Sequence, residues 1–230
     1  MSEDQSTKEP QYNMLFEVAR KHGVTKFGIM ANESWNQDPK RTLFTLSRYK
    51  FVARMFEGLE NVLEVGCADA FGTRIVQQGV KNVTAVDFDP LFIDDVKARH
   101  DANWPLDARV HDMIIDGPVA PGNFDAAFAL DVLEHINPEN EDAFLKNFVA
   151  SIAPEGKMIV GIPSLESQEH ASPQSKEGHV NCQSGRDFKK TMEKYFHTVF
   201  VFSMNDEVVH TGFYPMAHYL FAVCSHKKQG

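Results

Sequence analysis

A chain of 230 residues is long enough for one well-packed α/β domain and too short for two of ordinary size. Hydrophobic residues make up 43% and charged residues 24%, which is typical of a soluble globular protein. The formal net charge of −9 argues against broad binding to a nucleic-acid backbone, which requires clustered lysines and arginines. We therefore expect a small-molecule partner and no nucleic acid.

The three cysteines, Cys67, Cys182 and Cys224, are scattered, and their spacing matches neither a disulfide framework nor a zinc site. The first residues lack the basic start and apolar core of a secretory signal. No apolar run approaches the roughly 20 residues that span a bilayer. These features predict a cytoplasmic protein that does not bind a membrane, and they leave open whether it forms a homo-oligomer.

Residues 1–58 are predicted to form a helical extension before the main domain. Apolar residues recur with helical spacing over residues 12–19, and a His-Gly pair follows as a stop signal. Residues 25–40 hold several glycine, asparagine and proline residues, so we expect a loop there. Residues 39–58 open with proline, carry a broad apolar face and close with glycine, which predicts a second helix.

Residues 59–230 are predicted to form the main domain, in which strands alternate with helices. Residues 124–130 are a continuous apolar run, as expected for a strand that helices cover on both faces. The alternation predicts a doubly wound, mostly parallel, Rossmann-like α/β sheet of seven strands with helices on both faces. The predicted strands are 62–65, 83–86, 108–110, 124–130, 157–162, 199–203 and 219–224. The predicted helices run through 75–79, from 89 onward, near 139–152 and near 184–195.

Small and acidic residues follow the first three strands of the predicted sheet. Gly66, Ala68 and Ala70 allow a sharp turn and a close approach of a ligand to the backbone. Asp87 closes the second strand and can accept hydrogen bonds from both hydroxyls of a ribose. Asp112, with the methionine after it, suits an adenine ring. Because open parallel sheets bind ligands beyond the carboxyl ends of their strands, these residues predict a nucleoside site.

The charge of this site favours one nucleoside cofactor over another. Dinucleotide enzymes also have a small-residue turn followed about 20 positions later by an acidic residue. They place a phosphate at a helix N-terminus, whereas Glu64, Asp69 and Asp87 make this region negative. Carboxylates suit a ligand with an amino group and a sulfonium, so we expect S-adenosylmethionine (SAM) and not a nicotinamide dinucleotide.

Residues 62–162 resemble the class I SAM-dependent methyltransferases in the order and spacing of the family's motifs. Residues 63–70, Leu-Glu-Val-Gly-Cys-Ala-Asp-Ala, resemble the first motif, although Ala68 and Ala70 stand where glycine is common. The resemblance implies SAM as methyl donor and S-adenosylhomocysteine as product. It implies cofactor contacts from these residues: Glu64, Gly66, Ala68, Gly72, Asp87, Phe88, Asp112, Met113 and Asp131.

The sequence Asp131-Val-Leu-Glu134-His135 ends the fourth strand, beside the expected methyl group. A hydroxyl acceptor must lose a proton, which requires a general base or a metal ion. His135 is the best candidate base because its unperturbed pKa lies near neutral pH. The alternative is a structural histidine that hydrogen-bonds a backbone carbonyl. Asp131 and His179 are the further candidate catalytic residues.

Residues 163–183 are predicted to be a structureless connection that closes over the acceptor. The segment is rich in serine, glutamine, asparagine and histidine, which suit a polyhydroxylated ligand. A second polar cluster, residues 205–214, links the last two strands. The whole chain resembles bacterial methyltransferases of surface-polysaccharide and secondary-metabolite pathways. That resemblance implies methyl transfer to a hydroxyl of a small polar, sugar-like acceptor.

Two alternatives to a hydroxyl acceptor stay open at this point. A small amine needs less help from a base, and a chain that has lost catalysis would be a SAM-binding partner module. Asp131, Glu134 and His135 are weak candidates for divalent metal ligands, with His179 and His210 as further donors. Their spacing defines no ligand set, so a metal is allowed but not favoured.

Overall fold

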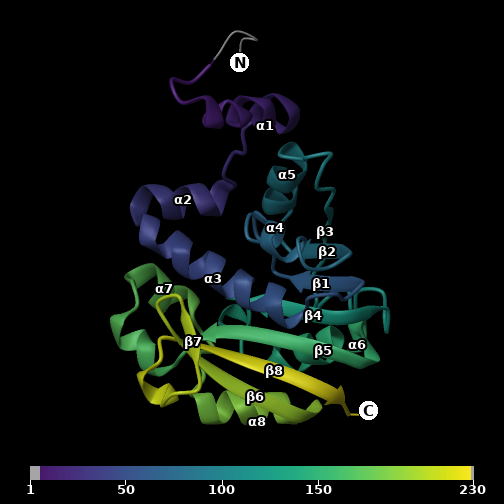
Figure 1. Cartoon of the computed structure of the whole chain (residues 1–230). Helices are drawn as coiled ribbons and strands as arrows, with labels where there is room; N and C mark the ends of the chain where they lie inside the picture. Colours follow the sequence, from purple (N-terminus) through teal and green to yellow (C-terminus); the bar gives the residue numbers. More distant parts are fainter. Residues whose placement is uncertain (1–5, 229–230) are drawn as a thin grey trace.

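The computed structural model describes residues 6–228, and its centre is one sheet of eight strands (Figure 1). The strands are β1 (Asn61–Val65), β2 (Asn82–Asp87), β3 (Asp107–Val110), β4 (Phe124–Leu130), β5 (Ile152–Pro163), β6 (Phe196–Asn205), β7 (Val208–His210) and β8 (Tyr219–Lys227). Their order in the sheet is β3-β2-β1-β4-β5-β8-β6-β7. β1 to β5 pair in parallel, and the last three strands are added antiparallel. The predicted doubly wound α/β fold is confirmed.

The helices are α1 (Met14–His22), α2 (Ile29–Gln37), α3 (Pro39–Met55), α4 (Thr73–Val76), α5 (Pro90–Ala98), α6 (Glu141–Ser151), α7 (Pro173–Gly178) and α8 (Gly185–Glu193). Four short 3-10 helices are η1 (Pro10–Tyr12), η2 (Leu133–His135), η3 (Glu166–His170) and η4 (Tyr214–Met216). Local sequence explains several starts. Asp89 accepts the Leu91 N–H at 2.9 Å ahead of Pro90, which fixes the start of α5.

Helices cover both faces of the sheet, and the strand residues alternate between them. Phe128 and Ile159 pack in a core with α3 and α4, whereas Ala127 and Val160 pack in a second core with α6 and α8. Successive side chains of a strand point to opposite faces, so each central strand feeds both cores. Among the described residues, no helix is both long and apolar enough to cross a bilayer.

The prediction of seven strands is wrong by one strand, because β7 lies in the segment expected to be a polar linker. β7 pairs antiparallel with the end of β6, with Ser203 opposite His210. The tight turn between them places Asp206 in a left-handed conformation, with φ +49°. A strand of three residues is too short to show the alternation that identifies strands in sequence.

The prediction of a loop over residues 25–40 is also wrong, because α2 occupies most of it. Carboxylates from other elements accept the first free N–H groups of α2, with Asp95 Oδ2 3.3 Å from the Ile29 nitrogen and Asp69 Oδ2 2.7 Å from the Ala31 nitrogen. The Trp35 ring packs on Phe27, whose centroid is 5.5 Å away. Tertiary contacts therefore stabilise a helix that the local sequence does not favour.

Residues 163–183 are not structureless, which corrects a further prediction. The segment contains η3 and α7, and Ser172 caps α7 through the Ser175 N–H. Its two ends meet, since Leu165 donates its N–H to the Gln183 carbonyl at 3.0 Å. The segment is an ordered excursion from the end of β5 that returns to the sheet.

We expect Asp69→Ala to loosen α2, because the Ala31 N–H loses a buried charged acceptor. Such hydrogen bonds contribute about 1.5–3 kcal/mol, so amide exchange over residues 29–37 should rise about tenfold or more. Hydrogen exchange with mass spectrometry measures this change. Asp89→Ala removes the comparable cap of α5 and should leave exchange in α2 unaltered. Equal exchange of α2 in both variants would show that Asp69 does not stabilise this helix.

Candidate functional site

The turn after β1 has the backbone shape that its small residues predicted. Gly66, Ala68 and Ala70 have positive φ angles of +74°, +45° and +51°. Gly66 also has no room for a side chain, because an added Cβ would lie 2.3 Å from Val132 Cγ2. The alanines cost conformational energy in this left-handed region, so surrounding contacts must hold the turn.

Asp87 supplies one of these contacts from the end of β2. Its Oδ2 accepts the Ala68 N–H at 2.8 Å, and its Oδ1 accepts the Asp89 N–H at 3.0 Å. The carboxylate is buried and ties the turn after β1 to the turn after β2. Each carboxylate oxygen has a second lone pair, so Asp87 retains the capacity to accept hydrogen bonds from a ligand.

Glu64 uses both carboxylate oxygens within the protein. Tyr49 of α3 donates its hydroxyl to Oε1 at 2.8 Å, and Thr73 of α4 donates its hydroxyl to Oε2 at 2.5 Å. Gly72 lies against the same tyrosine, since a Cβ there would be 2.3 Å from Tyr49 Cδ2. These two predicted cofactor residues therefore fix α3 and α4 against β1. Burial raises the pKa of Glu64 to about 7.

Three further predicted cofactor residues follow β2 and β3, and of these Asp112 and Met113 were predicted to flank the adenine. Phe88 is 71% exposed beside Asp87, and its ring is available to a ligand. Asp112 Oδ1 accepts the N–H groups of Ile114 and Ile115, which shapes the turn after β3. Met113 is buried in the core beside α6. β2 and β3 pair at their carboxyl ends, so both turns lie at one edge of the sheet.

Arg48 is a site residue that we did not predict. It reaches from α3 to the end of β4, where its Nη1 donates to both carboxylate oxygens of Asp131 at 2.7 and 2.6 Å. Its guanidinium lies over the Tyr219 ring, 3.8 Å from the centroid. A signal was present in the sequence, because Arg48 is four residues from Phe44 and from Val52 on an apolar helix face.

Several buried polar atoms around Asp131 have no hydrogen-bond partner within residues 6–228. They are Arg48 Nε, Tyr219 Oη, His218 Nε2 and both carboxylate oxygens of Glu134. Buried polar groups are rarely left unpaired in folded proteins, and each one here requires a reason. A polar ligand at this edge of the sheet would supply the missing partners.

Glu134, His135 and His179 come together at this edge, with candidate ligand atoms all within 4.8 Å of one another. His135 Nδ1 is 2.9 Å from the Gly178 carbonyl, and His179 Nδ1 is 2.8 Å from Gln168 Oε1. Both partners are oxygens that only accept, so Nδ1 carries the hydrogen and Nε2 has a free lone pair on each ring.

The returning segment 163–183 is attached to this cluster through its backbone. Val180 and Asn181 donate their N–H groups to the Glu134 carbonyl at 2.8 and 3.0 Å. Burial and the nearby Asp131 raise the pKa of Glu134 well above its ordinary value. Burial is the main cause that lowers the pKa of His179, and the nearby His135 lowers it further. Both effects favour the neutral imidazole.

His210 does not join this cluster in the described part of the chain. It lies on β7, where its Nε2 faces Asn205 Oδ1 at 2.9 Å and its Nδ1 accepts the Gly212 N–H at 2.9 Å. Both ring nitrogens are therefore occupied by local partners. The second polar cluster predicted over residues 205–214 is a hairpin stabilised by its own side chains.

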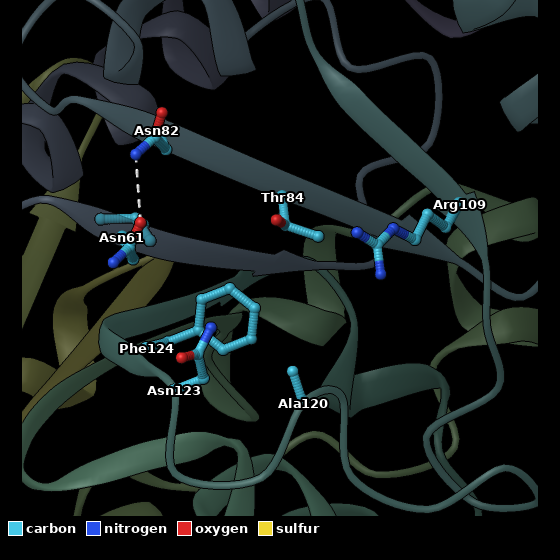
Figure 2. A pocket seen from close by; sticks show the side chains of 8 residues that line it. Asn61, Asn82, Thr84, Arg109, Ala120, Asn123 and Phe124 are labelled. Atoms are coloured by element: carbon cyan, nitrogen blue, oxygen red, sulfur yellow. Dashed lines mark hydrogen bonds between the residues drawn. The ribbon is translucent and has the colours of Figure 1, made fainter.

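A cavity of about 100 Å³ lies at the opposite edge of the sheet (Figure 2). Asn61 and Asn82 begin β1 and β2 there, and Asn82 Nδ2 donates to Asn61 Oδ1 at 3.1 Å. Arg109 and Phe124 complete its wall. Ligands of open parallel sheets bind at the carboxyl ends of the strands, so this cavity at the amino ends is not assigned to the functional site.

We expect the stability of the ligand-free protein to fall as pH rises, because of Glu64. The folded-state pKa of about 7 exceeds the ordinary value of 4.5, so the folded protein binds this proton more tightly than the unfolded chain. The contribution of this proton to the free energy of unfolding is fully present below the pKa that Glu64 has in the unfolded chain. It is lost as pH rises through the pKa of Glu64 in the folded protein. Between acidic pH and pH values above neutral, the free energy of unfolding of the unaltered protein should fall by about 3 kcal/mol relative to that of Glu64→Gln.

Urea unfolding of both proteins between about pH 4 and pH 8 measures this loss. Glutamine keeps the shape of the side chain and removes its ionisation, so it is the matched comparison. Parallel free-energy curves for the two proteins over this range would contradict the proposed ionisation of Glu64.

Comparison with known proteins agrees with this geometry. The sequence profile of the family described as Methyltransferase domain matches residues 62–156. The mitochondrial ubiquinone biosynthesis O-methyltransferase of Schizosaccharomyces pombe is 24% identical over 147 residues, covering 60% of this chain and 53% of that protein. The ubiquinone biosynthesis O-methyltransferase of Xanthomonas euvesicatoria is 26% identical over 142 residues, covering 60% of this chain and 59% of that protein. The chain thus matches little more than half the length of each relative.

Solved structures show the same fold. A putative methyltransferase in complex with the Haloferax volcanii Trm112 activator has a TM-score of 0.65 at 13% identity, covering 88% of this chain and 99% of that chain. The N-methyltransferase NodS from Bradyrhizobium japonicum, in complex with S-adenosylhomocysteine, has a TM-score of 0.63 at 17% identity. The match covers 83% of this chain and 89% of the NodS chain. Residues 62–156 therefore match the methyltransferase domain profile, and the chain has the fold of these solved methyltransferases.

Proposed function

We propose that this protein transfers a methyl group from SAM to a hydroxyl of a small polar molecule. One observation carries the proposal. The constrained turn at Gly66, tied to Asp87, lies at the same sheet edge as Asp131, Glu134 and His135, where buried polar atoms lack partners. A donor and an acceptor held side by side at one edge are what methyl transfer requires, because orientation supplies much of the rate enhancement.

The cofactor half of the site fits SAM by its shape and charge. The turn at Gly66, Ala68 and Ala70 allows close approach to the backbone, and Asp87 offers acceptors for ribose hydroxyls. Asp131 adds a second carboxylate, and Arg48 beside it offers a cation. A ligand with both a carboxylate and an amino group, as in the methionine part of SAM, is complementary to such a pair.

The acceptor half contains the groups that remove a proton. His135 is exposed and presents a free Nε2, so it accepts the hydroxyl proton at that atom. SAM supplies an electrophilic methyl group when bound. The Nδ1 hydrogen bond to Gly178 fixes the ring, so the structural and catalytic interpretations of His135 are compatible.

A hydroxyl acceptor is favoured over an amine. The relatives from S. pombe and X. euvesicatoria are named O-methyltransferases, although the similar NodS structure is an N-methyltransferase. Two imidazoles with free Nε2 atoms give the site more proton-accepting capacity than an amine needs. A sugar-like acceptor is the finer part of the proposal, and it rests on the polar composition of the segment 163–183.

The cluster of Glu134, His135 and His179 also fits a divalent cation. Both oxygens of Glu134 are buried without a partner among residues 6–228, and both histidines have the Nδ1 hydrogen bonds that orient metal-binding imidazoles. Carboxylate and imidazole donors suit first-row divalent metals. A cation held there would occupy the Nε2 lone pair of His135, so it would activate a hydroxyl acceptor by lowering its pKa in place of His135 acting as the base.

We expect Asp87→Ala to weaken SAM binding about tenfold to a hundredfold, because the ribose hydroxyls lose a charged acceptor worth about 1.5–3 kcal/mol. Isothermal titration calorimetry with SAM, and separately with NAD, measures this. Asp107→Ala removes a carboxylate of β3 that pairs with Arg109 and should bind SAM like the unaltered chain. Tight binding of NAD, or failure of the folded protein to bind SAM, would refute the assignment of the cofactor.

We expect the metal-free protein to bind about one Co²⁺ per chain, followed by its visible absorption spectrum. His179→Ala should weaken this binding by about a hundredfold or more, since it removes a ligand. His210→Ala removes a histidine outside the cluster and is the matched control. Equal effects of the two substitutions would exclude the proposed ligand set without affecting the SAM assignment.

A further inference from the structure

A cavity of about 650 Å³ is lined in part by Asp69, Ala70 and Phe71 of the turn after β1. α4, α5 and β3 form its walls, and α1 borders it through Val18 and His22. Gly66, Asp87 and Asp131 do not line it. The volume falls within the range of about 300–1,000 Å³ for small-molecule sites.

Arg74 is the most unusual group in this cavity. Its guanidinium lies over the Trp104 ring, 3.2 Å from the centroid. Its Nη1 is buried and has no hydrogen-bond partner within residues 6–228. Partial burial lowers the pKa of this side chain, which the nearby Asp101 only partly offsets. A desolvated guanidinium without an acceptor is complementary to a carboxylate or another planar anion.

The other charged groups of the cavity leave Arg74 available. Arg99 is paired with Asp95 at 2.9 Å. Asp69 accepts the backbone N–H groups of Ala31 and Phe71, so its oxygens already have partners. The Asp101 carboxylate accepts the backbone N–H of Asn103. Lys97, His22 and His100 add cationic or ionisable groups to the same wall.

The remaining lining residues are flat or apolar. Ile75, Val96 and Leu106 give the cavity an aliphatic wall, and Phe71 and Trp104 add aromatic rings. Trp104 is 43% exposed, so one part of its ring is open to a ligand. A flat apolar body with one anionic group would match both the walls and the guanidinium.

We propose that this cavity is a second ligand site, which binds an aromatic acid through an ion pair with Arg74 and stacking beside Trp104. Ala70 of the proposed cofactor turn borders the cavity, whereas Asp87 and the acceptor cluster lie outside it, so competition with SAM tests whether the two sites are separate. The carboxylate or sulfonate of the ligand pairs with the Arg74 guanidinium, and its ring lies against the aliphatic wall.

The dye 8-anilinonaphthalene-1-sulfonate is a suitable probe, because it joins an aromatic body to one anionic group. Trp35→Phe leaves Trp104 as the single tryptophan of the 230-residue chain, so energy transfer to the dye reports binding in this cavity. We expect saturable energy transfer that an excess of SAM does not displace. Dye binding without energy transfer from Trp104, or displacement by SAM, would overturn the proposed location.

Arg74→Gln, made in the Trp35→Phe background, tests the ion pair. We expect it to weaken binding of the sulfonate dye about tenfold or more and to leave binding of the neutral N-phenyl-1-naphthylamine unchanged. Arg54→Gln removes an exposed arginine of α3 that pairs with Glu57, and it should bind both dyes normally. Near-ultraviolet circular dichroism verifies folding of each variant. If Arg74→Gln weakened the binding of both dyes equally, or did not weaken the binding of the sulfonate dye, the proposed ion pair would be overturned.

Discussion

The left-handed turn after β1 is the constraint on which the rest of the site depends. Alanine in this conformation costs roughly 1–2 kcal/mol per residue, and the turn contains two alanines. The Gly66 and Cys67 N–H groups bond to the Val86 carbonyl, and Ala68 bonds to Asp87. Such strain persists only where the surroundings determine the conformation. β2 therefore stabilises a strained turn at the carboxyl ends of the central strands.

The acceptor side is constrained in a similar way at the end of β4. Asp131 has φ +57° and is held by Arg48, whose side chain is only 16% exposed. Glu134, three residues later, has two buried carboxylate oxygens without a partner in the described part of the chain. Packing against α3 and Tyr219 keeps these polar and charged side chains in place and away from water, where they would otherwise be hydrated. Unusual backbone geometry and unpaired polar atoms thus occur at the same edge of the sheet.

Sequence reasoning predicted the features that local chemistry determines. The profile match over residues 62–156 agrees with the predicted methyltransferase resemblance, and β4 has the predicted bounds because a buried parallel strand is a continuous apolar run. α2 was missed because its first N–H groups depend on Asp69 and Asp95, which are distant in sequence. Arg48 was missed for the same reason, since its partner Asp131 is 83 residues away.

The two halves of the site differ in how their residues are distributed along the sequence. The cofactor half uses one short turn and Asp87, so a motif in the sequence identifies it. The proposed acceptor half takes Glu134 and His135 from η2 and His179 from the returning segment. We propose that these dispersed positions select the acceptor, whereas the turn after β1 binds the donor. Because fold alone does not determine the substrate, the residues around Glu134 are where this chain's acceptor specificity must be sought.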